Sequence, residues 1–204
     1  MGTGYWFGTG VVFEGGGNDT YKSCYFTQAS GAHFCIGALI DEAGDDRYLT
    51  FETSGAAIAF GWDYTDALLV DKSGNDYFEL KGNGLGLAQI RSNAFFINLG
   101  GNDTYRHGAG AEGIGASSFM DFYKDPPAFS RYNIYSNSFG TFLDIGGEDQ
   151  YLDWNVGEDK AVPSSRYQNN STWFSPPKDS PNYGYRSFGV GMDVESGRIL
   201  EIGP

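Results

Sequence analysis

The chain has 204 residues, a formal net charge of −13 and an aromatic content of 17%. The negative charge argues against nucleic acid and anionic membranes as partners, because both require a basic patch. No apolar run approaches the roughly 18 residues of a membrane-spanning helix, so we expect no membrane insertion. The aromatic content is too high for a disordered chain, and we expect one folded domain over residues 1–204.

One turn motif of glycine, aspartate and an aromatic residue occurs five times. In chain order the copies are Gly16–Tyr21, Ala43–Tyr48, Ser73–Phe78, Gly100–Tyr105 and Gly146–Tyr151. Their central glycines are Gly17, Gly44, Gly74, Gly101 and Gly147, at spacings of 27, 30, 27 and 46 residues. A recurrence in this range indicates a repeat architecture, in which each unit buries its apolar face against its neighbours. We expect the five glycines to stack in one column.

Each copy of the motif follows a short apolar run, which predicts a buried strand. These runs are Val11–Phe13, Ala38–Ile40, Leu68–Val70, Phe95–Ile97 and Thr141–Leu143. After each motif we expect a second strand with small residues at alternate positions, as in residues 55–59, 84–88 and 113–116, where neighbouring backbones approach closely. A degenerate sixth copy at Phe188–Asp193 closes the series.

These elements predict an all-β fold, with a parallel β-solenoid (β-helix) of about six coils stacked ~4.8 Å apart. The alternative is a β-propeller or another antiparallel fold, although a four-stranded blade usually needs about 40 residues. The opening residues Met1–Trp6 already follow the repeat style, from which we expect a mature or excised fragment.

The motif Gly-Gly-Asn-Asp-Thr-Tyr resembles the calcium-binding nonapeptide repeats of secreted bacterial RTX proteins. The resemblance implies an extracellular or cell-surface β-solenoid whose stacked turns bind Ca²⁺. Here the motif occurs once per coil instead of every nine residues. The metal ligands that the resemblance implies are Asp19, Asp46, Asp76, Asp103 and Asp149.

Physical chemistry leaves two interpretations of this aspartate column. Carboxylates stacked about 5 Å apart repel by roughly 3 kcal/mol at an effective dielectric constant of 20, which a cation would offset. Alternatively, each aspartate caps its own turn by accepting backbone N–H bonds. The same ambiguity holds for a second polar column, in which Asn98 could form a hydrogen-bonded ladder with less charge. This second column contains Glu14, Asp41, Asp71, Asn98 and Asp144.

Two inserts, at about residues 119–138 and 152–186, lengthen the later repeats, and we expect them to project from one corner of the solenoid. Insertions on one face of a repeat protein often build its binding face. Their aromatic residues either pack the inserts down, contact another protein, or stack on carbohydrate. A smaller insert in an earlier repeat carries Trp62 and Tyr64. The candidate ligand or partner face contains Trp62, Tyr64, Tyr123, Tyr132, Trp154, Trp173 and Tyr185.

No catalytic or cofactor-binding motif is evident, and a non-enzyme is favoured. Walker A loops, nucleophile elbows and zinc-ligand patterns are absent from the sequence. If the chain did act on glycosides, the two carboxylates would be Asp121 or Asp125 facing Glu158 or Asp159 across the inserts. Cys24 and Cys35 either form a disulfide or remain thiols.

The sequence therefore favours an extracellular structural or interaction module of a surface, filament or large secreted protein, with Ca²⁺ as a stabilising ion. Its partners would be a second copy, because unpaired terminal strands template pairing, or another extracellular protein. The alternative is a carbohydrate-binding or carbohydrate-active β-helix that uses the aromatic inserts.

Overall fold

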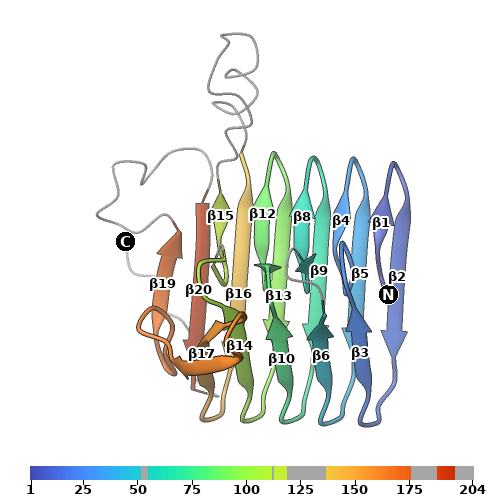
Figure 1. Ribbon diagram of the computed structural model, residues 1–204. Helices are drawn as coiled ribbons and strands as arrows, with labels where there is room; N and C mark the ends of the chain where they lie inside the picture. The colour runs from blue at the N-terminus through green and yellow to red at the C-terminus, as the bar shows by residue number, and fades with distance from the viewer. Residues whose placement is uncertain (52–54, 112, 119–136, 176–187, 196–204) are drawn as a thin grey trace, which may run out of the picture.

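The computed structural model describes residues 1–51, 55–111, 113–118, 137–175 and 188–195. The described residues form an all-β fold without helices, in which mostly parallel strands make several sheets (Figure 1). The expected all-β class is therefore confirmed. None of the described elements is a helix that could cross a membrane.

The largest sheet has seven strands, in the order β19-β20-β16-β13-β9-β5-β2. Six of them are parallel and come from successive repeats, whereas β19 is antiparallel to β20. Their bounds are β2 (Thr9–Glu14), β5 (Ile36–Asp41), β9 (Asp66–Asp71), β13 (Asn93–Asn98), β16 (Phe139–Ile145), β19 (Thr172–Ser175) and β20 (Phe188–Val194).

A second sheet of six strands has the order β18-β17-β14-β10-β6-β3, with β18 as its antiparallel member. The strands are β3 (Thr20–Ser23), β6 (Arg47–Thr50), β10 (Tyr77–Leu80), β14 (Thr104–Gly108), β17 (Gln150–Asn155) and β18 (Lys160–Pro163).

Short strands complete the fold in a parallel five-stranded sheet and a two-stranded sheet. The former contains β1 (Gly4–Tyr5), β4 (Gly31–Ala32), β8 (Phe60–Trp62), β12 (Leu87–Gln89) and β15 (Ser117–Ser118), and the latter β7 (Ala56–Ala57) and β11 (Asn83–Gly84).

Equivalent residues of successive repeats stack on one another. The motif aromatics Tyr21, Tyr48, Phe78, Tyr105 and Tyr151 form a buried column with ring centroids 4.6 to 5.1 Å apart. The central glycines also stack, as expected, because a Cβ atom at Gly101 would lie 1.4 Å from the carbonyl oxygen of Gly74. The φ angle of Gly101 is +138°, so this column requires glycine for both its space and its backbone conformation.

Two kinds of core hold the sheets together. Large side chains fill the space between the seven- and six-stranded sheets, where Leu39, Leu69, Phe96 and Phe142 pack with the motif aromatics. Glycine and alanine line the contact with the five-stranded sheet, where a Cβ at Gly140 would lie 1.8 Å from the Ala116 carbonyl oxygen. The alternating small residues thus allow the close approach expected from the sequence.

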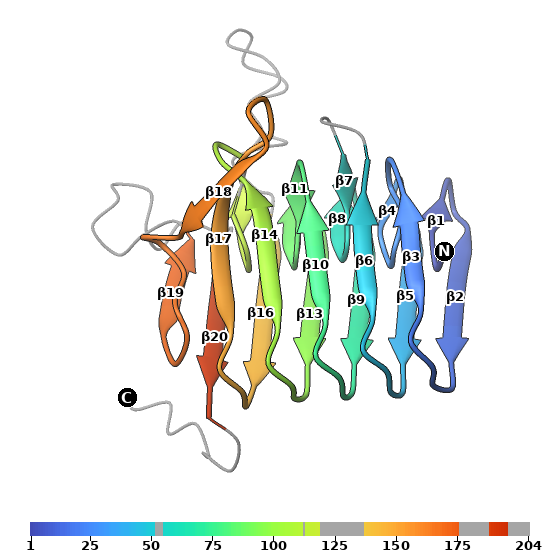
Figure 2. The same ribbon diagram turned by 60° about the horizontal axis from the view of Figure 1, so that its bottom comes forward.

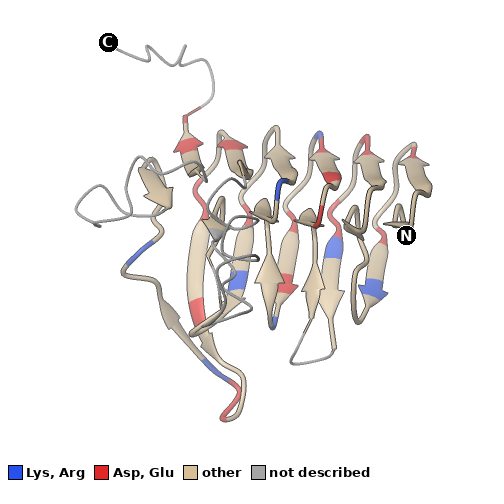
Figure 3. Ribbon diagram, turned by 90° about the horizontal axis from the view of Figure 1, so that it is seen from above, with Lys and Arg blue, Asp and Glu red and all other residues tan. Residues whose placement is uncertain are grey.

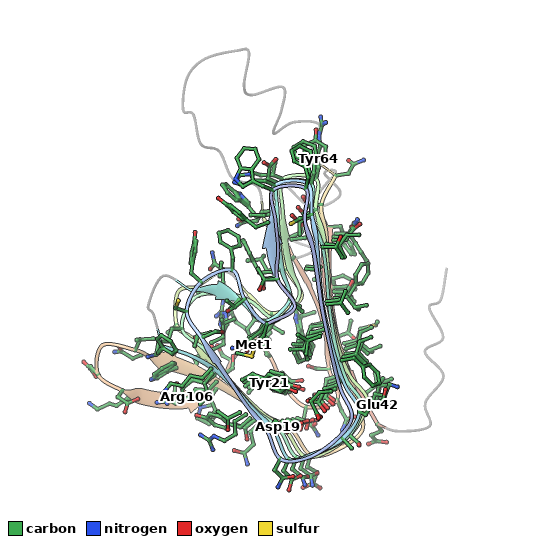
Figure 4. The ribbon with its side chains drawn as sticks, turned by 90° about the vertical axis from the view of Figure 1, so that its right-hand side faces the viewer. Met1, Asp19, Tyr21, Glu42, Tyr64 and Arg106 are labelled. Carbon is green, nitrogen blue, oxygen red and sulfur yellow. The ribbon has the colours of Figure 1, made fainter. Side chains whose placement is uncertain are left out.

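The outward side of the seven-stranded sheet is also apolar, and we call it the outer apolar face. Its side chains at Val11 and Phe13 are 61% and 66% exposed, and those at Ile36 and Phe139 are 47% and 36% exposed. The face also includes Ile40, Leu68, Val70, Phe95, Ile97, Leu143, Val190 and Met192. Within the described part of the chain, no strand covers this face (Figure 4).

The two ends of the stack differ (Figure 2). At the N-terminal end, β1, β2 and β3 are the outermost strands of their sheets. At the other end, antiparallel β18 and β19 cover the edges of two sheets. Residues 152–186 therefore do not simply project from one corner, since parts of this segment join two different sheets as β17, β18 and β19. Cys24 is exposed and Cys35 is buried, and the two thiols are not bonded.

Candidate metal centre

The motif aspartates form a hydrogen-bonded ladder along the stack. The backbone N–H of Asp19 donates to Asp46 Oδ1 at 2.6 Å, and the N–H of Asp46 donates to Asp76 Oδ1 at 2.7 Å. The next two steps, Asp76 to Asp103 and Asp103 to Asp149, measure 2.6 and 2.7 Å. Each of these carboxylates caps the preceding motif, and not its own turn as one interpretation of the sequence expected.

The residue before each aspartate forms a second ladder that runs in the opposite direction. The N–H of Asp45 donates to Asn18 Oδ1 at 3.0 Å, and the N–H of Asn75 donates to Asp45 Oδ1 at 2.8 Å. The backbone N–H groups of Asn102 and Glu148 continue the pattern. Short side chains with an acceptor oxygen at both positions thus join neighbouring turns twice.

The second polar column lies inside the fold and accepts hydrogen bonds from the motif tyrosines. The hydroxyl of Tyr21 donates to Asp41 Oδ2 at 2.5 Å, and that of Tyr48 donates to Asp71 Oδ2 at 2.7 Å. In the later repeats Tyr105 donates to Asp144 at 2.5 Å, and Tyr151 donates to Asp193 at 2.7 Å. Each tyrosine therefore binds the inner carboxylate of the following repeat.

At one position in the stack, both the tyrosine and the aspartate of this pair are replaced. The aromatic residue there is Phe78, which has no hydroxyl, and the inner residue of the next repeat is the amide Asn98. Asn98 Nδ2 instead donates to Asp103 Oδ2 at 2.9 Å and to the Tyr105 hydroxyl oxygen at 3.1 Å. The sequence reasoning missed this pairing, although the joint change to phenylalanine and asparagine was a visible signal.

The two columns meet in two buried groups of three carboxylates. The first triad is Asp41, Asp46 and Asp71, and the second triad is Asp103, Asp144 and Asp149. In each triad, one oxygen from every residue lies within 4.8 Å of the other two. Acidic residues recur at equivalent places along the stack (Figure 3), and carboxylate oxygens gather beside Tyr21 and Asp19 in the view along it (Figure 4).

Burial and mutual repulsion raise the pKa values of Asp46, Asp71, Asp103, Asp144 and Asp149, which makes these carboxylates hard to ionise without a counter-charge. Burial, with a further contribution from the charge of Asp149, raises the pKa of Asp144 to about 9. Burial raises the pKa of Asp71 to about 7, and the charges of Asp41 and Asp46 raise it as well. The pKa values of Asp46 and Asp149 rise to about 6, again chiefly through burial. At neutral pH each triad therefore needs protons or a cation.

The triads contain some of the expected metal ligands and add others. Asp46, Asp103 and Asp149 belong to a triad, whereas Asp19 and Asp76 belong to neither. The additional members Asp41, Asp71 and Asp144 come from the second polar column, which the sequence left ambiguous. The residue of that column in the repeat after Asp76 is Asn98, so among the described residues no third carboxylate completes a triad there.

The described residues of the expected ligand or partner face lie in different parts of the fold and do not form one surface. Trp62 ends β8, and Tyr64 stacks on Phe34 at the turn that follows, with ring centroids 4.5 Å apart. Trp154 is buried in the six-stranded sheet, where the guanidinium carbon of Arg106 lies 3.9 Å from its ring centroid.

Trp173 belongs to β19 and packs against Phe142, and its Nε1 donates to the Ile114 carbonyl at 2.8 Å. Its position suits core packing at the C-terminal end of the stack. Tyr123, Tyr132 and Tyr185 lie outside the described residues, as do Asp121 and Asp125 of the possible glycosidase pair.

No family model matches the chain, and neither a curated protein nor a solved structure matches it significantly. Functional inference therefore depends on the geometry of the chain itself.

Proposed function

We propose that the protein is a parallel β-solenoid with a structural role, an extracellular or cell-surface module that is stabilised by Ca²⁺ and associates with a second copy of itself. The observation that supports this proposal most is the outer apolar face. Soluble proteins rarely leave a contiguous apolar surface uncovered unless it serves an interaction.

The size of the outer apolar face suits a specific interface. Six parallel strands at ~4.8 Å and five residues at ~3.3 Å span roughly 29 by 17 Å, or about 500 Å² in projection. The largest apolar patch of a typical monomer is about 300–600 Å². Because side chains make the accessible area larger than the projection, the face approaches the ~800 Å² per partner of a standard interface.

Charge favours a second copy as the occupant. The protein has a net charge of −13, which should keep copies apart wherever acidic surfaces meet. Among the outward-facing side chains of the six parallel strands, Asp66 is the one charged residue in the described chain, and Asn93 Nδ2 donates to its Oδ1 at 2.8 Å. The inner acidic column points away from this face. Two such faces also share the same strand repeat, which lets their side chains interdigitate.

The carbohydrate alternative finds less support in the exposed aromatic residues. Phe7, Phe34 and Tyr64 stack on one another with ring centroids 5.2 and 4.5 Å apart. Their ring faces therefore cover each other, whereas carbohydrate recognition uses open ring faces. Phe7, which is 74% exposed, is the terminal ring of this stack.

The oligomeric state tests the proposal. We expect the wild-type protein to be a dimer by analytical ultracentrifugation, and Val70→Lys on the outer apolar face to be a monomer with an unchanged far-ultraviolet circular dichroism spectrum. The matched control is Leu49→Lys, on the outward side of β6 in the six-stranded sheet, which should remain dimeric. A monomeric wild type would refute the self-association. Binding to a glycan panel that Trp62→Ala abolishes would support the alternative.

A further inference from the structure

We propose that two Ca²⁺ ions bind inside the fold, one at each carboxylate triad, and that the step from Phe78 to Asn98 separates the two sites. This inference rests on the Ca²⁺ stabilisation in the proposed function, and it replaces five sites at the turns with two interior ones. It does not depend on the association through the outer apolar face.

Unpartnered buried oxygens in the second triad are the observation that points to a ligand. Asp144 is completely buried, and its Oδ1 accepts no hydrogen bond while its Oδ2 accepts the Tyr105 hydroxyl. Asp149 Oδ2 is also buried without a partner, while its Oδ1 accepts the Asp103 N–H. A buried carboxylate oxygen without a donor is costly, so the triad has a strong need for a cation or a proton.

The first triad is built differently, from the inner carboxylates Asp41 and Asp71 of two successive repeats and one motif aspartate, Asp46. Asp46 Oδ2 and Asp71 Oδ1 are buried without a hydrogen bond of good geometry. The Asp41 carboxyl lies near Asp46, and the Ser73 N–H lies near Asp71, so the second triad provides the more direct evidence. Both triads nevertheless join an unpartnered inner oxygen to an unpartnered motif oxygen.

Asn98 provides an internal control within the same column. At this position an amide replaces the carboxylate, and its Nδ2 donates to Asp103 Oδ2. Among the motif aspartates Asp46, Asp76, Asp103 and Asp149, only Asp103 therefore has a partner for its Oδ2 in the described chain. A hydrogen-bond donor thus faces Oδ2 where the column supplies an amide, and the Oδ2 atoms of Asp46, Asp76 and Asp149 lack an equivalent donor.

The spacing of the triads is compatible with Ca²⁺, and their chemistry fits Ca²⁺ better than other common ions. Oxygen ligands lie about 2.3–2.6 Å from Ca²⁺, so two ligands of one ion are at most ~4.6–5.2 Å apart. The oxygens of each triad lie within 4.8 Å of one another, which is close enough for all three to bind one Ca²⁺. Mg²⁺ would draw its ligands to within about 4.2 Å and usually keeps several waters, which buried triads disfavour. The ligands are all oxygens, which disfavours zinc and copper.

The tyrosine hydroxyls act as positioning groups for the two sites. Tyr105 holds Oδ2 of Asp144, and Tyr48 holds Oδ2 of Asp71, so the other oxygen of each carboxylate is left for the ion. Hydrogen bonds of this kind orient metal ligands in many proteins. A hydroxyl that holds one oxygen and an ion that binds the other would together satisfy the buried carboxylate.

The test is a count of bound ions in the intact chain. Wild-type protein, freed of metal with a chelator and then dialysed against Ca²⁺, should contain two Ca²⁺ per chain by elemental analysis and isothermal titration calorimetry. Asp144→Asn and Asp71→Asn should each contain one, and the double variant none. Asp45→Asn removes an exposed carboxylate outside both triads and should still contain two.

Two results would overturn the inference. One is wild-type protein that contains no Ca²⁺ after dialysis, and whose thermal midpoint is the same in Ca²⁺ and in chelator. The other is Asp144→Asn protein that binds as many ions as the wild type. If chelation unfolds the chain, elemental analysis of protein purified in Ca²⁺ gives the same count. Sedimentation of the chelated protein reports the association separately, so the two proposals can fail independently.

Discussion

At equivalent positions of successive repeats, the motif aromatic and the inner residue of the following repeat form either a tyrosine–aspartate pair, such as Tyr105 and Asp144, or the phenylalanine–asparagine pair of Phe78 and Asn98. Each pair, which we call a step, leaves no hydroxyl or carboxylate without its counterpart. In the tyrosine–aspartate step, a hydroxyl meets a buried carboxylate at 2.5 Å. In the phenylalanine–asparagine step, both groups are missing, and an amide donates to the neighbouring Asp103 instead. The comparison teaches that hydroxyl and carboxylate are one unit, because either alone would leave a buried polar group without its partner.

The aromatic stack does not depend on this unit. The ring of Phe78 lies 4.6 Å from that of Tyr48 and 5.1 Å from that of Tyr105, like the rings of the complete steps. Stacking and polar pairing are therefore separable properties of the same column. Substitutions can exchange one kind of step for the other without disturbing the rings.

The largest expected effect is a dependence of stability on pH in chelator. The folded-state pKa values of Asp144 and Asp71, about 9 and 7, lie above those of unfolded aspartate, about 3.9. The folded state then binds more protons, so the free energy of unfolding is highest at low pH and falls as the pH rises from about 4 to 9. The slope is about 1.4 kcal/mol per pH unit for each extra proton.

Urea denaturation of chelated protein between pH 5 and pH 9 measures this slope. Asp144 faces Asp103, Asp149, Asp193 and Tyr105. Replacing the Tyr105–Asp144 pair by phenylalanine and asparagine removes the titrating carboxyl of Asp144 and leaves the three other aspartates. The variant Tyr105→Phe/Asp144→Asn should therefore show a shallower slope than the wild type. A stability that rises with pH over this range would contradict the expectation.

The next effect is that of Asn98→Asp alone. The new carboxylate would face Phe78, which offers no hydroxyl, and it would remove the donor to Asp103. An uncompensated buried charge costs about 3–5 kcal/mol of unfolding free energy. Adding Phe78→Tyr should recover part of the loss in urea denaturation of the chelated protein. The pairing would be refuted if Asn98→Asp were as stable as the wild type.

A smaller loss is expected for Tyr105→Phe. It removes the hydroxyl that donates to Asp144 and accepts from Asn98, and we expect a cost of about 1–3 kcal/mol. Combined with Asp144→Asn, the loss should be smaller than the sum of the single losses. A double-mutant cycle measures this coupling, and strictly additive losses would show that the two groups are energetically independent.

The smallest effect is expected for Asp45→Asn on the exposed ladder. The amide oxygen can still accept the Asn75 N–H bond that Asp45 Oδ1 accepts at 2.8 Å. The unfolding free energy should stay within about 0.5 kcal/mol of the wild type. A larger loss would mean that the charges of the exposed ladder contribute as much to the unfolding free energy as those of the buried column.

The repeat was readable from sequence because glycine, aspartate and an aromatic residue recur in one local order, although the copies are 27 to 46 residues apart. Gly101 stacks on the glycine of the preceding repeat, and Phe95–Ile97 lies in strand β13, as the repeated motif predicts. Each depends on residues within a few positions of one another, so local patterns were sufficient. The small residues at the contact with the five-stranded sheet were predictable for the same reason.

The polar pairing was harder to predict because its partners are distant in sequence. Tyr21 and Asp41 are 20 residues apart, whereas Tyr105 and Asp144 are 39 apart, since an insert lies between them. The sequence shows these separations as differences in insert length. No short sequence motif, however, contains both the tyrosine and the aspartate that it contacts. The antiparallel β18 and β19 were also missed, because they lie in a segment that does not follow the repeat.

The in-register pairing of successive repeats has a consequence for insertions and deletions. Gain or loss of a whole repeat leaves every column continuous, so the chain can grow or shrink in steps of one repeat. Loss of a single residue from β9 would turn the side chain of Asp71 outward and bring Val70 inward, because side chains alternate between the two faces. Duplication of a whole repeat therefore preserves the fold when such a chain changes length, whereas deletion of a single residue within a strand disrupts it.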